Sequence, residues 1–597
     1  MIGRQPSFWL LVLASLASSL LLTASHLPLA WGWLGWIGWV PFGLLIRAPR
    51  MPRLYLAAWL GSLPFYFLVL WWLSVSNWFM TLAWIVLALY GSLYVPVLLA
   101  VWRRLDQAGW PLLLSFPVGL VCMEWVRGNV MGGVVSLLRG HHQHDWPGGF
   151  AWYLLGHTQH DVPEMIQIAD LFGAYGISFV LALVNALFIE MLLPTRQGVV
   201  APALERPPLQ RSRLHLLLQG WLVALIVLAT LGYGVWQLRR ETMRPGPRLA
   251  LLQGSTAQEL RDRAFFQGGN AAEIQAKLYV ELCKRALATQ PDLIVWPETS
   301  NPGIWKELHP GEPDLDARDL MQALLKRYPV PHLLGLNVLE LDEAGVARFY
   351  NSAVLIRPPL HPGGNSYQGR YDKIHRVPFG EYVPFGEVFA WLQGLGPNSG
   401  RYDIAPGRQF TRFRLGEQLT FGTLICYEDS VPMIAREYLR GQAPVDFLVN
   451  ISNDGWWRGT FGHDQHLAVA RFRAVECRRS IVRAVNMGIS AIIDSNGRVL
   501  ASERQMQGQF AIWRVTEPAR ALPLWQWRSF RVQPGVVVGR VPLDQRDSWY
   551  VWWGDSGVLL AGLTLLVLLL RSRPKRQEPA EESPDARKHA DSHPVVA

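Results

Sequence analysis

Long apolar runs follow one another through the first 240 residues of the chain, and one more occurs near its end. A helix that crosses a bilayer needs about 20 mostly apolar residues. Eight stretches meet that requirement, approximately residues 8–24, 28–46, 54–74, 79–102, 110–126, 170–193, 214–236 and 550–570. The pattern predicts a seven-span membrane region over residues 1–240 and an eighth span at 550–570. The first run is long and further spans follow at once, so we interpret it as a span and not as a cleaved secretory signal.

Positive charges occur in every second loop between these runs. They are Arg4; Arg47, Arg50 and Arg53; Arg103 and Arg104; Arg196, Arg206, Arg211 and Arg213; and Arg571, Arg573, Lys575 and Arg576. Short loops rich in Lys and Arg stay on the cytoplasmic side. We therefore expect both termini in the cytoplasm and the region after the seventh span on the opposite side. The net charge of +10 follows largely from this distribution, so it does not indicate a nucleic-acid partner.

The loop at residues 127–169 is predicted to lie on the same side as that region. It contains His141, His142, His144, His157 and His160, a set that raises the question of a metal site. Their spacing matches no helical or hairpin pattern of metal ligands, so we predict no metal here. We interpret the loop as polar and interfacial, with its histidines and with Trp146 and Trp152 at the level of the lipid headgroups.

The periodicity changes at about residue 245, where short β-rich runs begin that end in polar or glycine-containing turns. These runs are 249–254, 293–298, 333–339, 352–356, 419–428, 447–454, 481–486 and 490–494. Between them, Ile274, Leu278, Leu282 and Ala286 share one face of a predicted amphipathic helix. Continuously apolar strands such as LIVW and FLVNI indicate sheets covered on both faces. Residues 245–545 are therefore predicted to form a layered α/β domain.

Composition agrees with a chain in two parts. Half of the 597 residues are hydrophobic and 17% are charged, which is typical neither of a pure membrane bundle nor of a soluble enzyme. Four cysteines in so long a chain exclude a disulfide scaffold and a cysteine-rich metal centre. Residues 571–597 are basic at first and then rich in Glu, Pro, Asp and His, so we expect a cytoplasmic and then disordered tail.

Polar and reactive side chains stand where several predicted strands end. Glu298 closes LIVWPE, Cys426 closes FGTLICYE, and Asn453 and Asp454 close FLVNISND. Strand ends are where α/β sheets present their chemistry. A cysteine nucleophile needs a base, which Glu298 could be if burial raises its pKa. Lys373, in YDKIHRVPFGEYVPF, could donate to the oxyanion that forms on attack.

Each of these residues also has a purely structural interpretation. Free cysteines are commonly small buried apolar residues, and we interpret Cys122, Cys283 and Cys477 in that way. Cys426 differs because three polar residues, Tyr427, Glu428 and Asp429, follow it directly. Exposed lysines and glutamates at strand ends are usually solvated surface residues. Spacing along the chain cannot by itself bring Glu298, Lys373 and Cys426 together.

Three segments resemble the Glu, Lys and Cys motifs of the nitrilase superfamily. They are WPETS at 296–300, YDKIHRVPFGEYVPF at 371–385 and LICYEDS at 424–430, and their order and spacing agree with the superfamily. NISNDGWWRGTFGHDQHLAVARFRAVE at 450–476 and RAVNMGISAIIDSNGRV after it extend the similarity. With seven spans before this domain and one after it, the chain resembles the apolipoprotein N-acyltransferase family over almost its whole length.

That resemblance implies a fold, a reaction and a location. The fold is a polytopic helical membrane bundle with a four-layer αββα domain that faces the periplasm of a bacterial inner membrane. The reaction moves an acyl chain from a phospholipid, usually phosphatidylethanolamine, to the N-terminal amine of the diacylglyceryl-cysteine of an apolipoprotein. No cofactor is implied, and we expect a monomer.

The resemblance also implies roles for individual residues. Cys426 is the expected nucleophile and forms a thioester, Glu298 is the general base, and Lys373 stabilises the oxyanion. Supporting positions on which the family depends are occupied by Glu381, Tyr427 and Glu428.

The chain departs from the family pattern at three places. A GFPW-like element is common before the sixth span, where this chain has GFAW at 149–152, and QGST at 253–256 stands where QGN-like sequences are usual. The histidine-rich stretch before Trp146 is also unexpected. These differences leave the three reactive residues intact but concern how the lipid headgroup and the acceptor peptide are held.

Two other functions stay open. A membrane-anchored amidase of the nitrilase type would use the same three residues, with water in place of an amine attacking the thioester; the eight-span frame favours a lipid substrate instead. A transporter or scaffold with an inactive domain is disfavoured by the intact set of reactive residues and by the near absence of charges within the spans.

Overall fold

The computed structural model describes residues 6–49, 51–76, 78–138, 151–193, 213–301, 303–309, 311–341, 346–359, 361, 364–378, 380–383, 403–441 and 443–572. Several sequence features lie outside these residues: His141, His142, His144 and Trp146 of the histidine-rich loop, most of the basic loop before the seventh predicted span, and the tail from residue 573.

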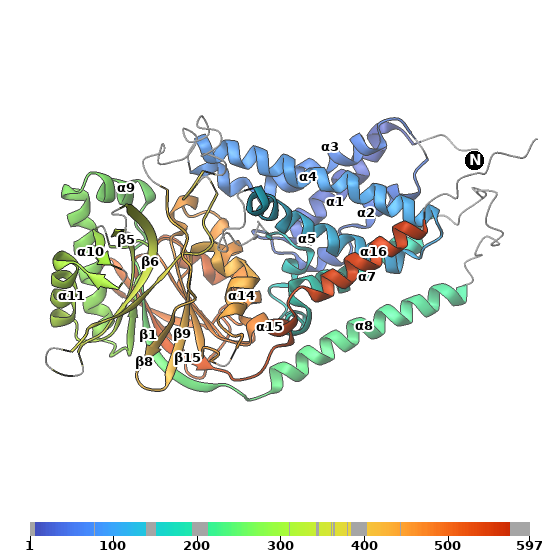
Figure 1. Cartoon of the computed structure of the whole chain (residues 1–597). Helices are drawn as coiled ribbons and strands as arrows, with labels where there is room; N and C mark the ends of the chain where they lie inside the picture. The colour runs from blue at the N-terminus through green and yellow to red at the C-terminus, as the bar shows by residue number, and fades with distance from the viewer. Residues whose placement is uncertain are drawn as a thin grey trace, which may run out of the picture.

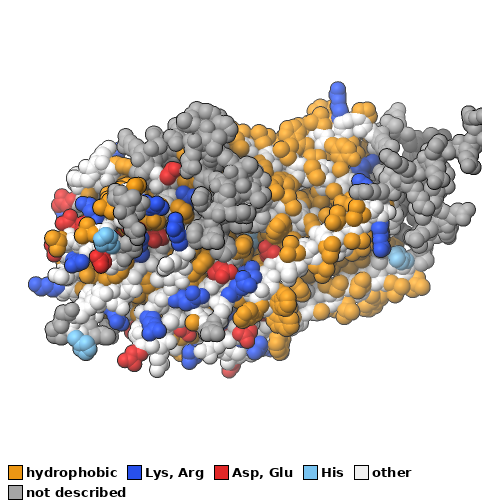
Figure 2. All heavy atoms as spheres, in the orientation of Figure 1, with side chains coloured by type: hydrophobic (Ala, Val, Ile, Leu, Met, Phe, Trp, Pro, Cys, Tyr) orange, Lys and Arg blue, Asp and Glu red, His pale blue; other side chains and the backbone are white. Residues whose placement is uncertain are grey.

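The N-terminal part of the chain folds into a bundle of apolar helices (Figure 1). Its long helices are α1 (Phe8–Ser25), α3 (Leu54–Val69), α4 (Trp78–Gln107), α5 (Leu112–Leu138), α7 (Ala169–Leu192) and α8 (Arg213–Arg239), and α16 (Ser556–Arg571) joins them from the far end of the sequence. Among the described residues, α1, α4, α7 and α8 are long and apolar enough to cross a membrane, and α3 and α16 are shorter apolar helices. Apolar side chains cover the outside of the bundle, whereas charged ones gather over the remainder of the molecule (Figure 2).

Residues 28–46, predicted as one span, do not form a regular α-helix. The 3-10 helix η1 (Gly32–Trp36) is followed by the short α2 (Val40–Gly43) and the 3-10 helix η2 (Leu44–Arg47). Pro41 opens α2, in the position where the missing N–H of proline starts a new helical segment. The prediction of a single regular helix here is therefore wrong.

The predicted loop at 127–169 is also partly helical. Helix α5 continues to Leu138, and η4 (Leu155–Gln159) and α6 (Pro163–Ile166) precede α7. Its described aromatic and imidazole rings are buried and do not lie at the bundle surface, since Trp152, His157 and His160 are at most 6% exposed. The large domain covers them, with the ring of Phe472 4.9 Å from His157. The interfacial interpretation of these three residues is wrong for that reason.

The large domain contains two β-sheets that pack face to face (Figure 1). The larger sheet has ten strands: β1 (Arg244–Gln253), β2 (Leu293–Val295), β3 (Ile304–His309), β4 (Glu312–Pro313), β5 (His332–Leu341), β6 (Ala347–Ile356), β7 (Tyr367–Asp372), β13 (Ser502–Gln507), β14 (Phe510–Val515) and β15 (Gly535–Leu543). The smaller sheet has the order β12-β11-β10-β9-β8, from β8 (Arg412–Leu415), β9 (Leu419–Ile425), β10 (Phe447–Ser452), β11 (Ile481–Val485) and β12 (Ala491–Ile493). Strands β9, β10 and β11 run parallel.

Helices cover the outer face of each sheet. On β1, Leu249 and Leu251 lie in the core between the sheets, whereas Ala250 and Leu252 pack under helices, because successive side chains of a strand point to opposite faces. Helices α9 (Gln258–Phe266), α10 (Gly269–Leu287) and α11 (Leu315–Arg327) lie on that side, and α13 (Pro432–Glu437) and α14 (Gly462–Cys477) lie against the smaller sheet (Figure 1). The layer order confirms the predicted αββα fold. The amphipathic helix is confirmed as α10, although Ile274 is exposed and not on its buried face.

Helix α14 also packs against the bundle and joins the two parts of the molecule (Figure 1). Gln465 donates to the carbonyl of Leu27 at 3.0 Å. Arg478, at the end of α14, is fully buried and pairs with Asp170 of α7 at 2.5 Å. Burying a charge is tolerable only when it is paired, so this contact fixes the domain on the bundle.

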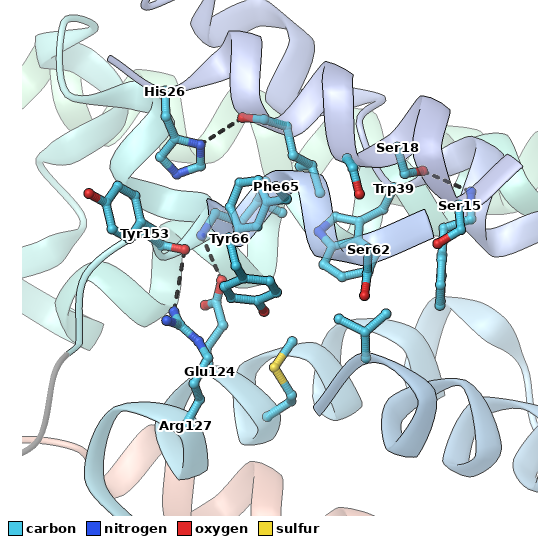
Figure 3. Close-up of a pocket in the computed structure, with 16 residues that line it drawn as sticks. Ser15, Ser18, His26, Trp39, Ser62, Phe65, Tyr66, Glu124, Arg127 and Tyr153 are labelled. Atoms are coloured by element: carbon cyan, nitrogen blue, oxygen red, sulfur yellow. Dashed lines mark hydrogen bonds between the residues drawn. The ribbon is translucent and has the colours of Figure 1, made fainter. Parts of the chain in front are cut away.

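A small cavity with a mixed polar and apolar lining lies inside the bundle among α1, α3 and α5 (Figure 3). Two charged side chains of α5 hold the chain segment beside it. Glu124 Oε1 accepts the backbone N–H of Leu155 at 2.6 Å, and Arg127 donates to the carbonyl of Trp152 at 2.7 Å. These charges thus bind backbone groups of the segment that leads to the large domain.

Candidate active site

Glu298, Lys373 and Glu381 meet in a buried cluster between the two sheets. Lys373 Nζ is 2.8 Å from Glu381 Oε1 and 3.4 Å from Glu298 Oε1, and Lys373 and Glu298 are 1% and 5% exposed. Glu298 follows β2 and Lys373 follows β7, two strands of the larger sheet that lie far apart in the chain. The fold therefore brings together residues that spacing alone could not.

Glu298 is fixed by donors at both carboxylate oxygens. Asn351 Nδ2 donates to Oε1 at 2.7 Å, and the backbone N–H of Asn453 donates to Oε2 at 2.8 Å. The turn before Glu298 lies so close to β5 that a Cβ at Gly335 would come 2.0 Å from the carbonyl oxygen of Pro297. Only glycine permits that approach.

Lys373 is charged in this setting. Burial favours the neutral amine, but Glu381 and Glu298 outweigh it and hold the pKa of Lys373 well above its usual value. Burial opposes ionisation of Glu381 too, yet Lys373 and the N–H of Val377 hold the pKa of this carboxyl below its usual value. Asn351 also donates to Glu381, at 3.0 Å.

Cys426 stands at the first position of η5 (Cys426–Ser430), directly after β9. Its φ of +56° is unusual for a residue with a side chain and costs of order 1–3 kcal/mol. Asn450 of the neighbouring strand β10 secures the turn by donating to the carbonyl of Cys426 at 2.8 Å. Burial, and then Glu298, raise the pKa of the Cys426 thiol well above its usual value, although Lys373 opposes them. The resting thiol is therefore protonated.

Glu428 ties the cysteine turn to the lysine segment. Its carboxylate accepts the backbone N–H groups of Ile374, His375 and Ile425 at 2.7–2.9 Å and the hydroxyl of Tyr371 at 2.9 Å. Burial raises the pKa of Glu428 to about 7, against the pull of these backbone donors.

The aromatic ring of Tyr427 lies beside Lys373. Its ring centroid lies 5.9 Å from Lys373 Nζ, and its hydroxyl donates to the carbonyl of Arg376 at 3.1 Å. All six residues singled out from the sequence therefore lie in one region.

The structure adds two groups that the sequence did not single out for this site. Asn351 bridges both carboxylates, and its only sequence signal is a lone amide in the apolar strand β6. The other group is the backbone N–H of Asn453; the sequence placed Asn453 at the end of its strand but did not predict that its backbone would bind Glu298. The remaining cysteines of the domain are structural, since Cys283 and Cys477 are buried in the hydrophobic cores.

Two sheets between helix layers, with a cysteine at a tight strand-end turn beside a buried lysine and glutamate, define a carbon–nitrogen hydrolase type of domain. The family model described as carbon-nitrogen hydrolase matches residues 248–516, and the model described as apolipoprotein N-acyltransferase N-terminal domain matches residues 18–187.

Curated relatives cover most of the chain. An apolipoprotein N-acyltransferase from Geobacter metallireducens is 31% identical over 487 residues, 81% of this chain and 79% of the relative, and one from Bdellovibrio bacteriovorus is 28% identical over 73% of this chain and 78% of the relative. A solved carbon–nitrogen hydrolase superfamily protein, XC1258 from Xanthomonas campestris, is 17% identical with a TM-score of 0.30 and covers 55% of this chain and 97% of its own. The chain belongs to the apolipoprotein N-acyltransferase family. It is a membrane-bound bacterial protein.

Proposed function

We propose that this protein moves a fatty acyl chain from a membrane phospholipid, through a thioester on Cys426, to the N-terminal amine of the diacylglyceryl-cysteine of lipoproteins. The observation that carries the proposal is the buried Glu298–Lys373–Glu381 cluster beside Cys426, in a chain whose other part is a bundle of apolar helices. Phosphatidylethanolamine is the proposed donor and a monomer the proposed state. An acyl adduct on Cys426 after incubation with this lipid is the expected result of the direct test.

In the first half-reaction Glu298 takes the thiol proton while Cys426 attacks the ester carbonyl of the phospholipid. Lys373 donates to the oxyanion. The carbon–oxygen bond of the ester then breaks, and Glu298 returns the proton to the departing alkoxide. Lysophospholipid is released, and the acyl chain stays on Cys426 as a thioester.

In the second half-reaction the lipoprotein amine attacks the thioester carbonyl. Glu298 accepts the amine proton, the carbon–sulfur bond breaks, and the proton passes to the released thiolate. The same residues therefore serve both halves of a ping-pong sequence.

Glu381 has a distinct part in this scheme. When Glu298 carries the proton it no longer balances the charge of Lys373. Glu381, 2.8 Å from Lys373 Nζ, stays as the counter-ion. The lysine therefore keeps its charge while the oxyanion forms.

The proposed topology has seven spans in residues 1–240, residues 245–545 in the periplasm, an eighth span at 550–570 and a cytoplasmic tail at 571–597, in the inner membrane. The support is the alternation of basic loops along the sequence. A site beside the outer leaflet would receive a phospholipid laterally, without its extraction into water.

Labelling of single cysteines tests this topology. We expect Leu315→Cys, at an exposed position of α11, to react with a membrane-impermeant maleimide added outside cells whose outer membrane is permeable. Ala108→Cys, between α4 and α5, should react only after lysis. Both changes are made with Cys426→Ala to remove the reactive thiol. Equal labelling of the two positions before lysis would contradict the topology.

A further inference from the structure

His466 of α14 lies within hydrogen-bond distance of two buried aspartates. Its Nε2 is 2.8 Å from Asp429 Oδ1, and its Nδ1 is 3.1 Å from both carboxylate oxygens of Asp454. The three side chains are at most 1% exposed. Each nitrogen of the imidazole ring therefore has its own aspartate partner.

The two aspartates belong to the two turns that carry the reaction. Asp429 lies in η5, three residues after Cys426. Asp454 begins η6 (Asp454–Trp457), and the residue before it, Asn453, donates its backbone N–H to Glu298 Oε2 at 2.8 Å. One imidazole ring thus connects the turn of the nucleophile to the turn that holds the base.

Arg483 of β11 completes the group from the other side. It pairs with Asp429, and its Nη2 is 3.8 Å from Asp454 Oδ2. Burial opposes ionisation of Asp454, but His466 first and then His463 outweigh it and hold the pKa of this carboxyl well below its usual value. His466 and Arg483 therefore contact two buried aspartates, and buried polar groups hold a fixed geometry when all of them are paired.

The membrane part of the chain covers the same imidazole. The ring of Trp152, between α5 and η4, lies 5.6 Å from the ring of His466, and Trp457 of η6 in the large domain adds a second ring at 5.4 Å. Arg127 of α5 donates to the carbonyl of Trp152, and Tyr153 donates to Gln465, the neighbour of His466. The bundle thereby excludes water from the group and restrains the helix turn that carries His466.

We propose that His466 is a positioning residue that sets the separation between the Cys426 thiol and the Glu298 carboxylate by holding Asp429 and Asp454 together. The inference rests on the proposed acyl transfer, because it assigns His466 to the step in which the thiol loses its proton. Among the described residues, the polar contacts of the His466 ring go to Asp429 and Asp454 and not to Cys426, Glu298 or Lys373.

The test compares His466→Gln with His463→Gln in the full-length protein. Glutamine has a single amide group in place of two ring nitrogens on opposite sides of the ring, so it keeps at most one of the two contacts. His463 is an equally buried residue of α14 that accepts the N–H of Gly459 at 2.9 Å and lies 3.9 Å from Asp454, and it has no described contact with Asp429. The acylation rate with phosphatidylethanolamine vesicles and the final fraction of acylated protein are followed by intact mass.

We expect His466→Gln to acylate about 100-fold more slowly, the effect of a misplacement of about 1 Å, and still to reach full acylation. The lipid concentration for half-maximal rate should change less than about twofold, because His466 contacts no lipid, and His463→Gln should lose less than about fivefold in rate. If His466→Gln reaches a lower final fraction of acylated protein, but the molecules that do react do so at the unmodified rate, its role is purely structural and the inference is overturned. Equal losses of rate in the two variants would also overturn it.

Asp454→Asn provides the second variant if His466→Gln does not fold. It keeps the side-chain shape but weakens the same bridge, so a comparable slowing is expected, and an unchanged rate would overturn the inference. If the unmodified protein acquires no adduct at all, the proposed function itself has failed. If it acquires one and the variants match it, only the role of His466 has failed.

Discussion

Replacement of Cys426 by alanine should abolish acyl transfer, with a loss of about 10⁴-fold or more, because no other group in the site can carry the acyl chain. Cys426→Ser should be almost as inactive. A serine hydroxyl is a weaker acid than a thiol, and burial already raises the pKa of the group at this position. The measurement is transfer of a labelled acyl chain from phospholipid to a diacylglyceryl peptide.

The matched controls are Cys283→Ala and Cys477→Ala. Both residues are buried cysteines of the same domain, in α10 and at the end of α14. Removing a thiol from a core lowers the free energy of unfolding by roughly 1 kcal/mol but leaves the reacting groups in place. Losses of transfer as large as that of Cys426→Ala would indicate that the domain had lost its fold and would contradict the assignment.

Glu298→Gln should slow acylation by about 10³-fold, within the range for loss of a general base. Glutamine keeps the shape of the side chain and an acceptor for the N–H of Asn453, but it cannot take the thiol proton. Alkaline pH should not restore the rate up to pH about 9, because burial holds the pKa of the Cys426 thiol well above its usual value. The measurement is a pH profile of the acylation rate for both proteins.

Glu340→Gln controls for the loss of a buried carboxylate. Glu340 lies on β5 of the same sheet and pairs with Arg370, away from Cys426. We expect this variant to unfold at lower temperature, because it loses an ion pair. It should acylate within about threefold of the unmodified rate, because the groups proposed to react are unchanged. A Glu298→Gln rate within tenfold of the unmodified protein, or its recovery at pH 9, would rule out Glu298 as the base.

Periodicity predicted the elements of the large domain well because both faces of its central strands are buried. On β1 successive side chains pack into two different hydrophobic cores: Leu249 and Leu251 into one, Ala250 and Leu252 into the other. A strand buried on both faces appears in the sequence as a continuous apolar run. Periodicity failed at residues 28–46. There the packing of Gly32, where a Cβ would come 2.4 Å from the carbonyl oxygen of Thr158, depends on a partner more than 100 residues away.

The residues that we propose to react could be singled out from the sequence because their chemistry is visible in side-chain type and motif. The groups that hold these residues in place could not be predicted from the sequence. The N–H of Asn453 is a backbone group, and Asn351 meets Glu298 and Glu381 only through the pairing of β6 with its neighbours. His466 is a similar case, since its two aspartates lie 37 and 12 residues away in the chain. Long-range contacts of this kind arise from the fold and not from local sequence.

The most direct test of acyl transfer through Cys426 is intact-mass analysis of the purified protein incubated with phosphatidylethanolamine, before and after addition of a diacylglyceryl-cysteine peptide with a free amine. The account predicts a mass increase of one acyl group that maps to Cys426, its disappearance when the peptide is added, and an equal amount of N-acylated peptide. An adduct that is discharged by water with the peptide amine unchanged, or no adduct together with hydrolysis of an amide, would contradict it and favour a membrane-anchored amidase.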